Sequence, residues 1–304
     1  MSGRENLLRS WRRHRTEYLA FLIFIAPNAM LFLTFTYWPI AYSCYLSLHD
    51  WNLLTGTGRW QGLENYFALW QSTEFWRVAL NTLVYAMGVV VIAQSAAFFL
   101  ALGLNRNIWG RSVYRTIAFT PHITTTAAAA LVWILLLHPD YGPLSRLYTT
   151  VGMQGWNWLE SGIMSLCALM VVGIWKEIGF ASIFFLAGMQ SLPQEPFEAA
   201  RLDGASAWTR LRHLVIPLMS PVIFLLLVTG FIASIKAFDT VAIMTEGGPV
   251  YPDSSLYVYH LYKLAFKDFR AGYASAFALV FFIATVTITL VQFRLASKWV
   301  HYDD

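Results

Sequence analysis

The sequence predicts an all-α, polytopic membrane protein with about six transmembrane helices. Its 304 residues are 57% hydrophobic and only 12% charged, whereas a soluble domain is nearer about 25% charged. Thirteen Trp and fifteen Tyr suit the aromatic belts that mark the two surfaces of a membrane. Six apolar stretches are long enough to cross a bilayer, which takes about 20 residues. They cover residues 19–46, 79–104, 114–137, 162–189, 214–236 and 275–295.

The first apolar stretch follows a basic N-terminus, as the core of a signal peptide would. It is longer than the roughly 7–15 residues of such a core, and no clear small-residue cleavage site follows it. We therefore expect it to be retained as the first span. The connection after it, 49–78, is rich in aromatic residues and is expected to lie on the outer membrane surface.

Arginines and lysines are distributed unevenly between the two sets of connections. Thirteen lie in the N-terminal segment, the second and fourth connections and the tail, and six lie in the other connections. Because positive residues favour the cytoplasmic side, both termini are expected there. This predicts a cytoplasmic segment over 1–18, a six-helix transmembrane domain over 19–297 and a cytoplasmic tail over 298–304. The net charge of +4 is spread beside apolar spans and does not indicate nucleic-acid binding.

The sequence lacks the common motifs of nucleotide hydrolysis and metal catalysis. It has no GxxxxGK[ST] loop for nucleotide phosphates and no HExxH or CxxC pattern for a metal. His122 and His138 lie at apolar positions or span edges and are expected to be structural rather than ligands. We therefore predict no catalytic residue, no metal site and no enzyme activity of its own.

The third stretch, 114–137, contains a proline and a run of small residues. Pro121 removes a backbone donor and should kink the helix, and the threonines at 124–126 can satisfy the freed carbonyl groups. The alanines at 127–130 allow close helix approach in lipid. The pattern predicts either tight packing or a kinked cavity wall.

The fourth stretch, 162–189, carries Lys176 and Glu177 at its centre. An ionised residue there costs about 2.5–3.5 kcal/mol on insertion scales. Adjacent helical residues point about 100° apart, so at least one of the two should face a polar cavity or another subunit. The alternative is a structural ion pair between helices.

The fifth stretch is followed by the turn signal MTEGGP, which includes Gly247, Gly248 and Pro249. Just before it, Lys236 and Asp239 are spaced so that they would pair on a continuous helix.

The connection over 190–213 predicts a short helix–turn–helix at the inner membrane surface. Ser191 offers a helix cap, and Pro193 or Pro196 fits the first turn. Gly204 ends this helix or allows a close approach, and Ser206 offers a second cap. Exposed charges of both signs make the segment a candidate docking element.

The same connection carries a motif that resembles a known family. EAARLDGA followed by LVIPL resembles the EAA motif of the permease subunits of bacterial type I ABC importers. The pattern EAAxxDGA is matched throughout, and only the exchange of Ile and Leu before Pro217 departs from it. The segments QGLENYF, NTLVY, WKEIGF, MQSLP and MTEGGP are similar to the carbohydrate-uptake branch, which contains sugar and glycerol-3-phosphate permeases. The resemblance covers the chain from about residue 19 to its end.

The resemblance implies the type I permease fold and a set of partners in a bacterial cytoplasmic (inner) membrane. These are a second, similar permease, two ATPase subunits that hold ATP and Mg, and an extracytoplasmic solute-binding protein. This chain itself would bind no cofactor and no nucleic acid, and membrane lipid would surround it. The coupling helix, which docks on the ATPase, would be formed by Glu198, Ala199, Ala200, Arg201, Asp203 and Gly204.

The resemblance also implies a function and its other sites. The chain would move a sugar, an oligosaccharide or a glycerol-3-phosphate-type solute into the cell by alternating access. Gly247, Gly248 and Pro249 would face the binding protein. The candidate translocation pathway consists of Trp133, Trp175, Lys176 and Glu177, because Trp rings can stack on sugars and Lys176 can meet an anion. A self-sufficient secondary transporter or channel is the alternative, and a membrane-embedded enzyme has no supporting motif.

Overall fold

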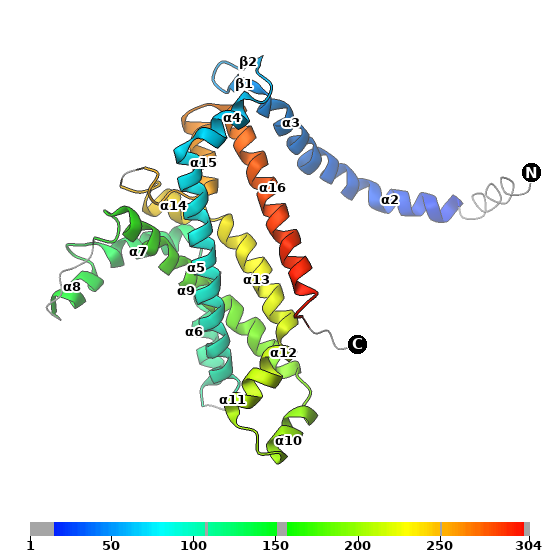
Figure 1. The fold of residues 1–304 in the computed structure, drawn as a ribbon, viewed down its shortest axis with the longest axis vertical. Helices are drawn as coiled ribbons and strands as arrows, with labels where there is room; N and C mark the ends of the chain where they lie inside the picture. Colours follow the sequence, from blue (N-terminus) through cyan, green and yellow to red (C-terminus); the bar gives the residue numbers. More distant parts are fainter. Residues whose placement is uncertain (1–14, 107–108, 151–156, 250, 301–304) are drawn as a thin grey trace, which may run out of the picture.

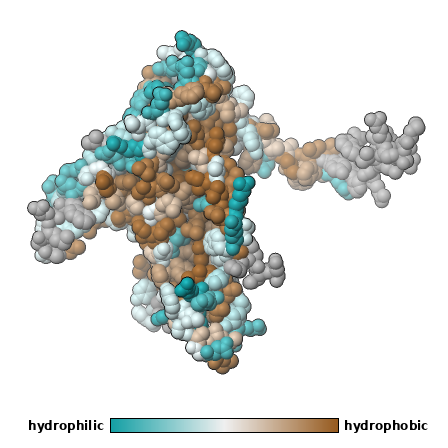
Figure 2. All heavy atoms as spheres, viewed as in Figure 1, coloured by the Kyte–Doolittle hydropathy of each residue, from teal (hydrophilic) through white to brown (hydrophobic). Residues whose placement is uncertain are grey.

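The computed structural model describes residues 15–106, 109–150, 157–249 and 251–300 and is almost wholly helical (Figure 1). Within these residues, five helical stretches are long and apolar enough to cross a membrane, and a bent pair of helices makes up to a sixth. The five stretches are Leu19–Ser47, Thr73–Leu104, Gly162–Ser191, Ser220–Met244 and Ala271–Ala296. A hydrophobic band lies between hydrophilic ends (Figure 2). The predicted fold class is confirmed.

The first crossing is an arm that leaves the body of the molecule (Figure 1). It consists of α2 (Arg15–Phe32), a π-helical turn η1 (Leu33–Tyr37) and α3 (Trp38–Ser47). No residue of its most apolar 18-residue window is buried, and Phe24 is 84% exposed. The arm contacts the body through α3, which packs on α16. Residues 1–14 and 301–304 of the predicted cytoplasmic segments lie outside the described residues.

The connection after the arm contains a hairpin that sequence reasoning did not predict. Strands β1 (His49–Asn52) and β2 (Thr57–Trp60) pair antiparallel, and α4 (Glu64–Gln71) follows. The buried amide of Asn65 donates hydrogen bonds to the carbonyl oxygens of Ser47 at 2.8 Å and His49 at 3.1 Å. These bonds fix the hairpin and α4 to the end of α3.

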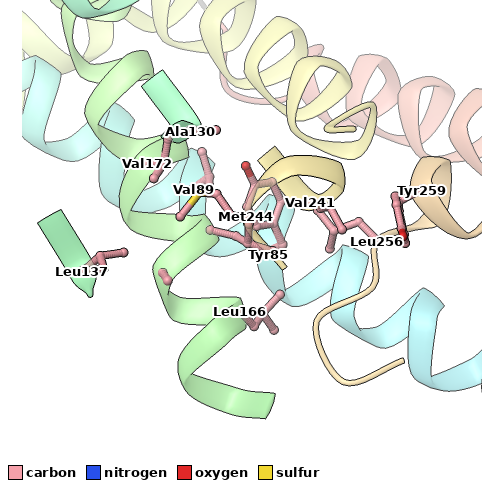
Figure 3. Close-up of a cluster of buried hydrophobic side chains, with 12 residues drawn as sticks. Tyr85, Val89, Ala130, Leu137, Leu166, Val172, Val241, Met244, Leu256 and Tyr259 are labelled. Carbon is pink, nitrogen blue, oxygen red and sulfur yellow. The ribbon is translucent and has the colours of Figure 1, made fainter. Parts of the chain in front are cut away.

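The body is built on α5 (Thr73–Leu104), α9 (Gly162–Ser191), α13 (Ser220–Ile235) and α16 (Ala271–Ala296). α5 and α9 pack along each other, and α13 packs on both of them. An apolar cluster joins α5 and α9 to α7 and α14, as Figure 3 shows. Its labelled members are Tyr85, Val89, Ala130, Leu137, Leu166, Val172, Val241, Met244, Leu256 and Tyr259.

The third stretch is bent, as predicted, but it is broken into two helices, α6 (Arg111–Ile123) and α7 (Thr126–Leu137), which meet at 99°. Thr124 and Thr125 between them are extended, and the Thr125 hydroxyl caps α7 by accepting from the amide of Ala128. Pro121 lies inside α6, three residues before the break. The direction change therefore occurs where a threonine cap starts a new helix, not at the proline. α8 (Pro143–Thr150) follows α7.

The predicted fifth span begins at residue 214, whereas the crossing in the structure begins at Ser220. Residues before α13 form α10 (Glu195–Leu202), α11 (Ala207–Arg210), a π-helical turn η2 (Leu211–Val215) and α12 (Ile216–Leu218). The crossing runs over Ser220–Met244 and includes α14 (Asp239–Met244). α15 (Tyr257–Tyr262) and a π-helical turn η3 (Lys263–Lys267) then lead to α16.

Candidate functional site

A polar cavity of about 350 Å³ lies where α5, α6, α7, α9, α13 and α14 meet. Its size falls within the range of small-molecule sites, about 300–1,000 Å³. Its ionisable and hydroxyl-bearing lining residues are Tyr85, His122, Thr126, Lys176, Glu177, Ser234, Lys236, Asp239 and Thr240. Both charged residues of the fourth stretch therefore face a polar cavity, which confirms that part of the prediction.

Lys176 bridges the break between α6 and α7. Its Nζ donates to the carbonyl oxygen of Thr124 at 2.7 Å and to the hydroxyl of Thr126 at 3.0 Å. The first contact satisfies a carbonyl group at the end of α6, and the second holds the start of α7. Among the described residues no carboxylate lies within ion-pair distance of Lys176, so the alternative of an interhelix ion pair is not observed for it.

Glu177 points toward α5 and α13 instead. Its Oε1 accepts a hydrogen bond from the amide of Gln94 at 3.5 Å, and that amide also donates to the carbonyl oxygen of Leu226 at 3.3 Å. A Cβ on Gly230 would stand 3.1 Å from Gln94 Nε2 and 3.4 Å from Glu177 Oε1, so the glycine leaves room for this junction. The adjacent charges thus diverge, as helical geometry requires.

Lys236 and Asp239 form no ion pair with each other in the described part of the chain, and that prediction is wrong. α13 ends at Ile235 and α14 begins at Asp239, so the two residues are not on one helix. Both line the cavity instead. Sequence reasoning missed them as site residues because their spacing suggested a local pair.

The predicted tryptophans lie beside each other but do not line this cavity. The rings of Trp133 on α7 and Trp175 on α9 are edge to face, with centroids 5.7 Å apart. Trp133 packs against the apolar cluster of Figure 3, and Trp175 is 38% exposed. Their place in a translocation pathway stays a prediction.

The connection before α13 forms the predicted helix–turn–helix. Pro196 lies in the first turn of α10, and Gly204 ends the helix with φ at 75°. The Ser206 hydroxyl caps α11 by accepting from the amide of Thr209 at 3.1 Å. Ser191 does not cap α10, because it is the last residue of α9 and its hydroxyl donates back to the carbonyl oxygen of Gly188.

α10 stands at the far end of the molecule from the hairpin (Figure 1). Glu198, Ala199, Arg201, Asp203 and Gly204 are exposed, and Ala200 is half-buried. None of these charged side chains has an ion-pair partner among the described residues. Leu202, which sequence reasoning did not single out, is 90% exposed. The sequence did carry a signal for it, because Leu202 is a large apolar residue between the charged residues Arg201 and Asp203.

Gly247 and Gly248 form the predicted turn, with φ at 94° and 112°. A Cβ on Gly247 would approach the ring of Tyr251 to 2.6 Å, so the turn needs glycine there. The chain after Pro249 lies on the start of α5, where Asn81 donates to the carbonyl oxygens of Pro252 at 3.1 Å and Asp253 at 3.0 Å.

Comparisons with known proteins agree with this architecture. The family profile described as "Binding-protein-dependent transport system inner membrane component" matches residues 93–301. The probable ABC transporter permease protein YesP of Bacillus subtilis (strain 168) is 33% identical over 96% of this chain and 95% of its own length. The trehalose/maltose transport system permease protein MalF of Thermococcus litoralis is 29% identical over 96% of this chain and 98% of its own length.

Two further likenesses concern other solutes. The sn-glycerol-3-phosphate transport system permease protein UgpA of Agrobacterium fabrum is 28% identical over 92% of this chain and 95% of its own length. A chain in the crystal structure of a bacterial ABC transporter involved in the import of alginate, an acidic polysaccharide, superposes with a TM-score of 0.82 at 23% identity. That match covers 95% of this chain and 99% of the alginate transporter chain.

Proposed function

Because the chain belongs to the inner membrane components of binding-protein-dependent ABC importers, we propose that it carries a neutral sugar or oligosaccharide into the cell. ATP hydrolysis in this family is the task of a separate subunit. Membership of the family sets aside a self-sufficient secondary transporter or channel. A glycerol-3-phosphate-type solute is the second candidate, because relatives of similar identity are named for it.

The charge balance of the cavity is the observation that favours a neutral solute. Lys176 and Lys236 supply two positive charges, and Glu177 and Asp239 supply two negative ones. A phosphate group is bound best by convergent cations without competing carboxylates. Hydroxyl groups of a sugar can donate to the carboxylates and accept from the ammonium groups, so a balanced site suits them.

The partner set that we propose consists of a second, similar permease, two ATPase subunits with their ATP and Mg, and an extracytoplasmic binding protein. The unpartnered charges of α10 and the exposed Leu202 support an ATPase at that surface. The turn at Gly247 and Gly248 precedes a segment that lies on the start of α5, at the end away from α10, and we assign it to the binding protein. One related crystal structure is of an alginate transporter in complex with an alginate pentasaccharide-bound periplasmic protein.

The position of α10 in the chain supports a mechanical link to the cavity. α9, which carries Lys176 and Glu177, ends four residues before α10 begins at Glu195. The chain after α10 enters α13, whose far end leads to Lys236. Movement of α10 by the ATPases would therefore shift two walls of the cavity together, which is how alternating access would arise. In this reading α10 and both chain termini are cytoplasmic.

A charge reversal tests the coupling role. The chain is reconstituted with its partner subunits, and solute-stimulated ATP hydrolysis is measured for Glu198→Lys. We expect stimulation to fall at least about tenfold, as for loss of a buried charge contact at an interface. The matched control is Glu64→Lys, the same reversal on the exposed first turn of α4. Stimulation that survives Glu198→Lys would show that α10 is not the coupling helix.

Uptake by the reconstituted transporter tests which class of solute the chain carries. Labelled maltose, trehalose and glycerol-3-phosphate are compared in wild type and in Lys176→Ala. We expect uptake of a neutral disaccharide and a larger loss of uptake than of assembled complex in the variant. Preferential uptake of glycerol-3-phosphate would reverse the ranking, and normal uptake by the variant would remove Lys176 from the pathway.

A further inference from the structure

Two arginines near the start of α6 share one neutral acceptor at the α10 end of the body. The amide of Gln190, at the end of α9, faces the guanidinium groups of Arg111 and Arg115. Because both neighbours are donors, we assign the oxygen to this side, where it accepts from both and lies 2.9 Å from Arg115 Nη2. The Nε atoms of both arginines are enclosed without a hydrogen-bond partner. Neither arginine has a carboxylate within ion-pair distance among the described residues.

This arrangement leaves positive charge without compensation. Each guanidinium has five N–H donors, and a single neutral oxygen cannot offset two cations that repel each other. The first turn of α6 adds to the positive potential, because its N-cap residue, Gly110, supplies no side-chain acceptor. An anion of phosphate chemistry, which guanidinium groups bind through two parallel hydrogen bonds, would complete the cluster.

A groove of about 640 Å³ lies between α5 and α6, and its α6 wall is made by residues of the same turns that carry the two arginines. Its lining is apolar or aromatic, and it includes Leu100, Tyr114 and Ile117. Tyr114 directly precedes Arg115, so one helix presents the cations and the groove on neighbouring faces. Trp109 at its mouth is 94% exposed, and Trp and Tyr are the residues that favour the headgroup level of a membrane.

We propose that Arg111 and Arg115 bind the phosphate of an acidic phospholipid, whose acyl chain lies in the groove between α5 and α6. The apolar groove beside the cations favours a lipid over a free phosphate ion. Gln190, which both arginines contact, is one residue before the last residue of α9, Ser191, and the chain then leads to α10. The proposal concerns lipid and holds whichever solute the transporter carries.

Native mass spectrometry of the full-length chain, purified from membranes that contain phosphatidylglycerol and phosphatidylethanolamine, tests the proposal. We expect wild type to retain phosphatidylglycerol preferentially. Arg111→Gln with Arg115→Gln should lower this retention at least about tenfold, the value for loss of a charged hydrogen bond. The control Arg106→Gln removes one exposed cation from the same connection and should change nothing.

A variant that fills the groove and leaves both arginines in place distinguishes binding of a lipid from binding of a free anion. A Cβ on Gly103 would meet no atom within 4 Å, so Gly103→Phe can fold while its ring fills the groove. We expect this variant to lose phosphatidylglycerol as well. Unchanged retention in Gly103→Phe, competition by millimolar inorganic phosphate alone, or equal retention in the arginine variant and wild type would each overturn the proposal.

Discussion

Gly179 on α9 offers the sharpest test of the described packing. A Cβ at this position would stand 1.9 Å from the carbonyl oxygen of Ala118 and 3.2 Å from the Cα of Phe119, both backbone atoms of α6. Real Cβ contacts essentially never fall below 3.0 Å. Gly179→Ala must therefore move α6 and α9 apart by at least about 1.1 Å, since backbone cannot rotate away as a side chain can.

The expected cost lies at the upper end of the range for overpacking, about 3 kcal/mol. For a chain of this size, that lowers the apparent melting temperature of the purified protein by about 5 °C. The separation also draws the Thr124 carbonyl away from Lys176, so uptake should fall even where the protein accumulates.

Gly103→Ala is the matched control, because the same methyl group meets nothing within 4 Å. It should be neutral or stabilise by up to about 1 kcal/mol through helix propensity. The measurement is the melting temperature of both variants and of wild type, by thermal unfolding in detergent. Equal melting temperatures for Gly179→Ala and Gly103→Ala would refute the close approach of α6 and α9.

Two further predictions concern the ends of the molecule. Leu202→Asp should release the ATPase subunits during purification, because a 90% exposed leucine on a docking helix loses its apolar contact. The control Leu54→Asp, in the hairpin, should leave co-purification of the ATPase subunits unchanged. The same undiminished co-purification for Leu202→Asp would contradict the prediction. Burial, and then the charge of Lys263, lower the pKa of His260 to about 4, although the Glu74 carboxylate lies 3.7 Å away and Tyr251 hydrogen-bonds the ring. The unfolded chain has a histidine pKa near about 6.5, so it binds the proton first and the free energy of unfolding should fall by about 2 kcal/mol between pH 7.5 and pH 5. His260→Gln should flatten that dependence in thermal unfolding, and a variant as acid-sensitive as wild type would assign the effect elsewhere.

Sequence reasoning succeeded where the determinants are local. Uninterrupted apolar length located α5, α9 and α16, because a membrane span needs little more than that length. Gly204 and Ser206 acted as the predicted stop and cap, since both act within a few residues of their own position. The divergence of Lys176 and Glu177 followed from helical geometry alone.

Determinants that act between distant segments were not visible in the sequence. The carbonyl group of Thr124 at the break accepts a hydrogen bond from Lys176, which is 52 residues away along the chain. Lys236 and Asp239 line the cavity because α13 ends at Ile235 and a new helix begins at Asp239, although their spacing also fits a local pair. The hairpin at β1 depends on Asn65, whose role requires that the chain has already folded back.

The bend between α6 and α7 changes how the lysine at 176 should be understood. With 13 and 12 residues, each half is about 20 Å long or less, too short to traverse about 30 Å of hydrocarbon alone. A carbonyl group left open by such a break inside a membrane protein needs a donor from the protein or from a polar cavity. At this break the ammonium group of Lys176 supplies that donor to Thr124. Relatives whose third crossing is a single straight helix have no such group to satisfy, and we expect the residue at this position to vary among them.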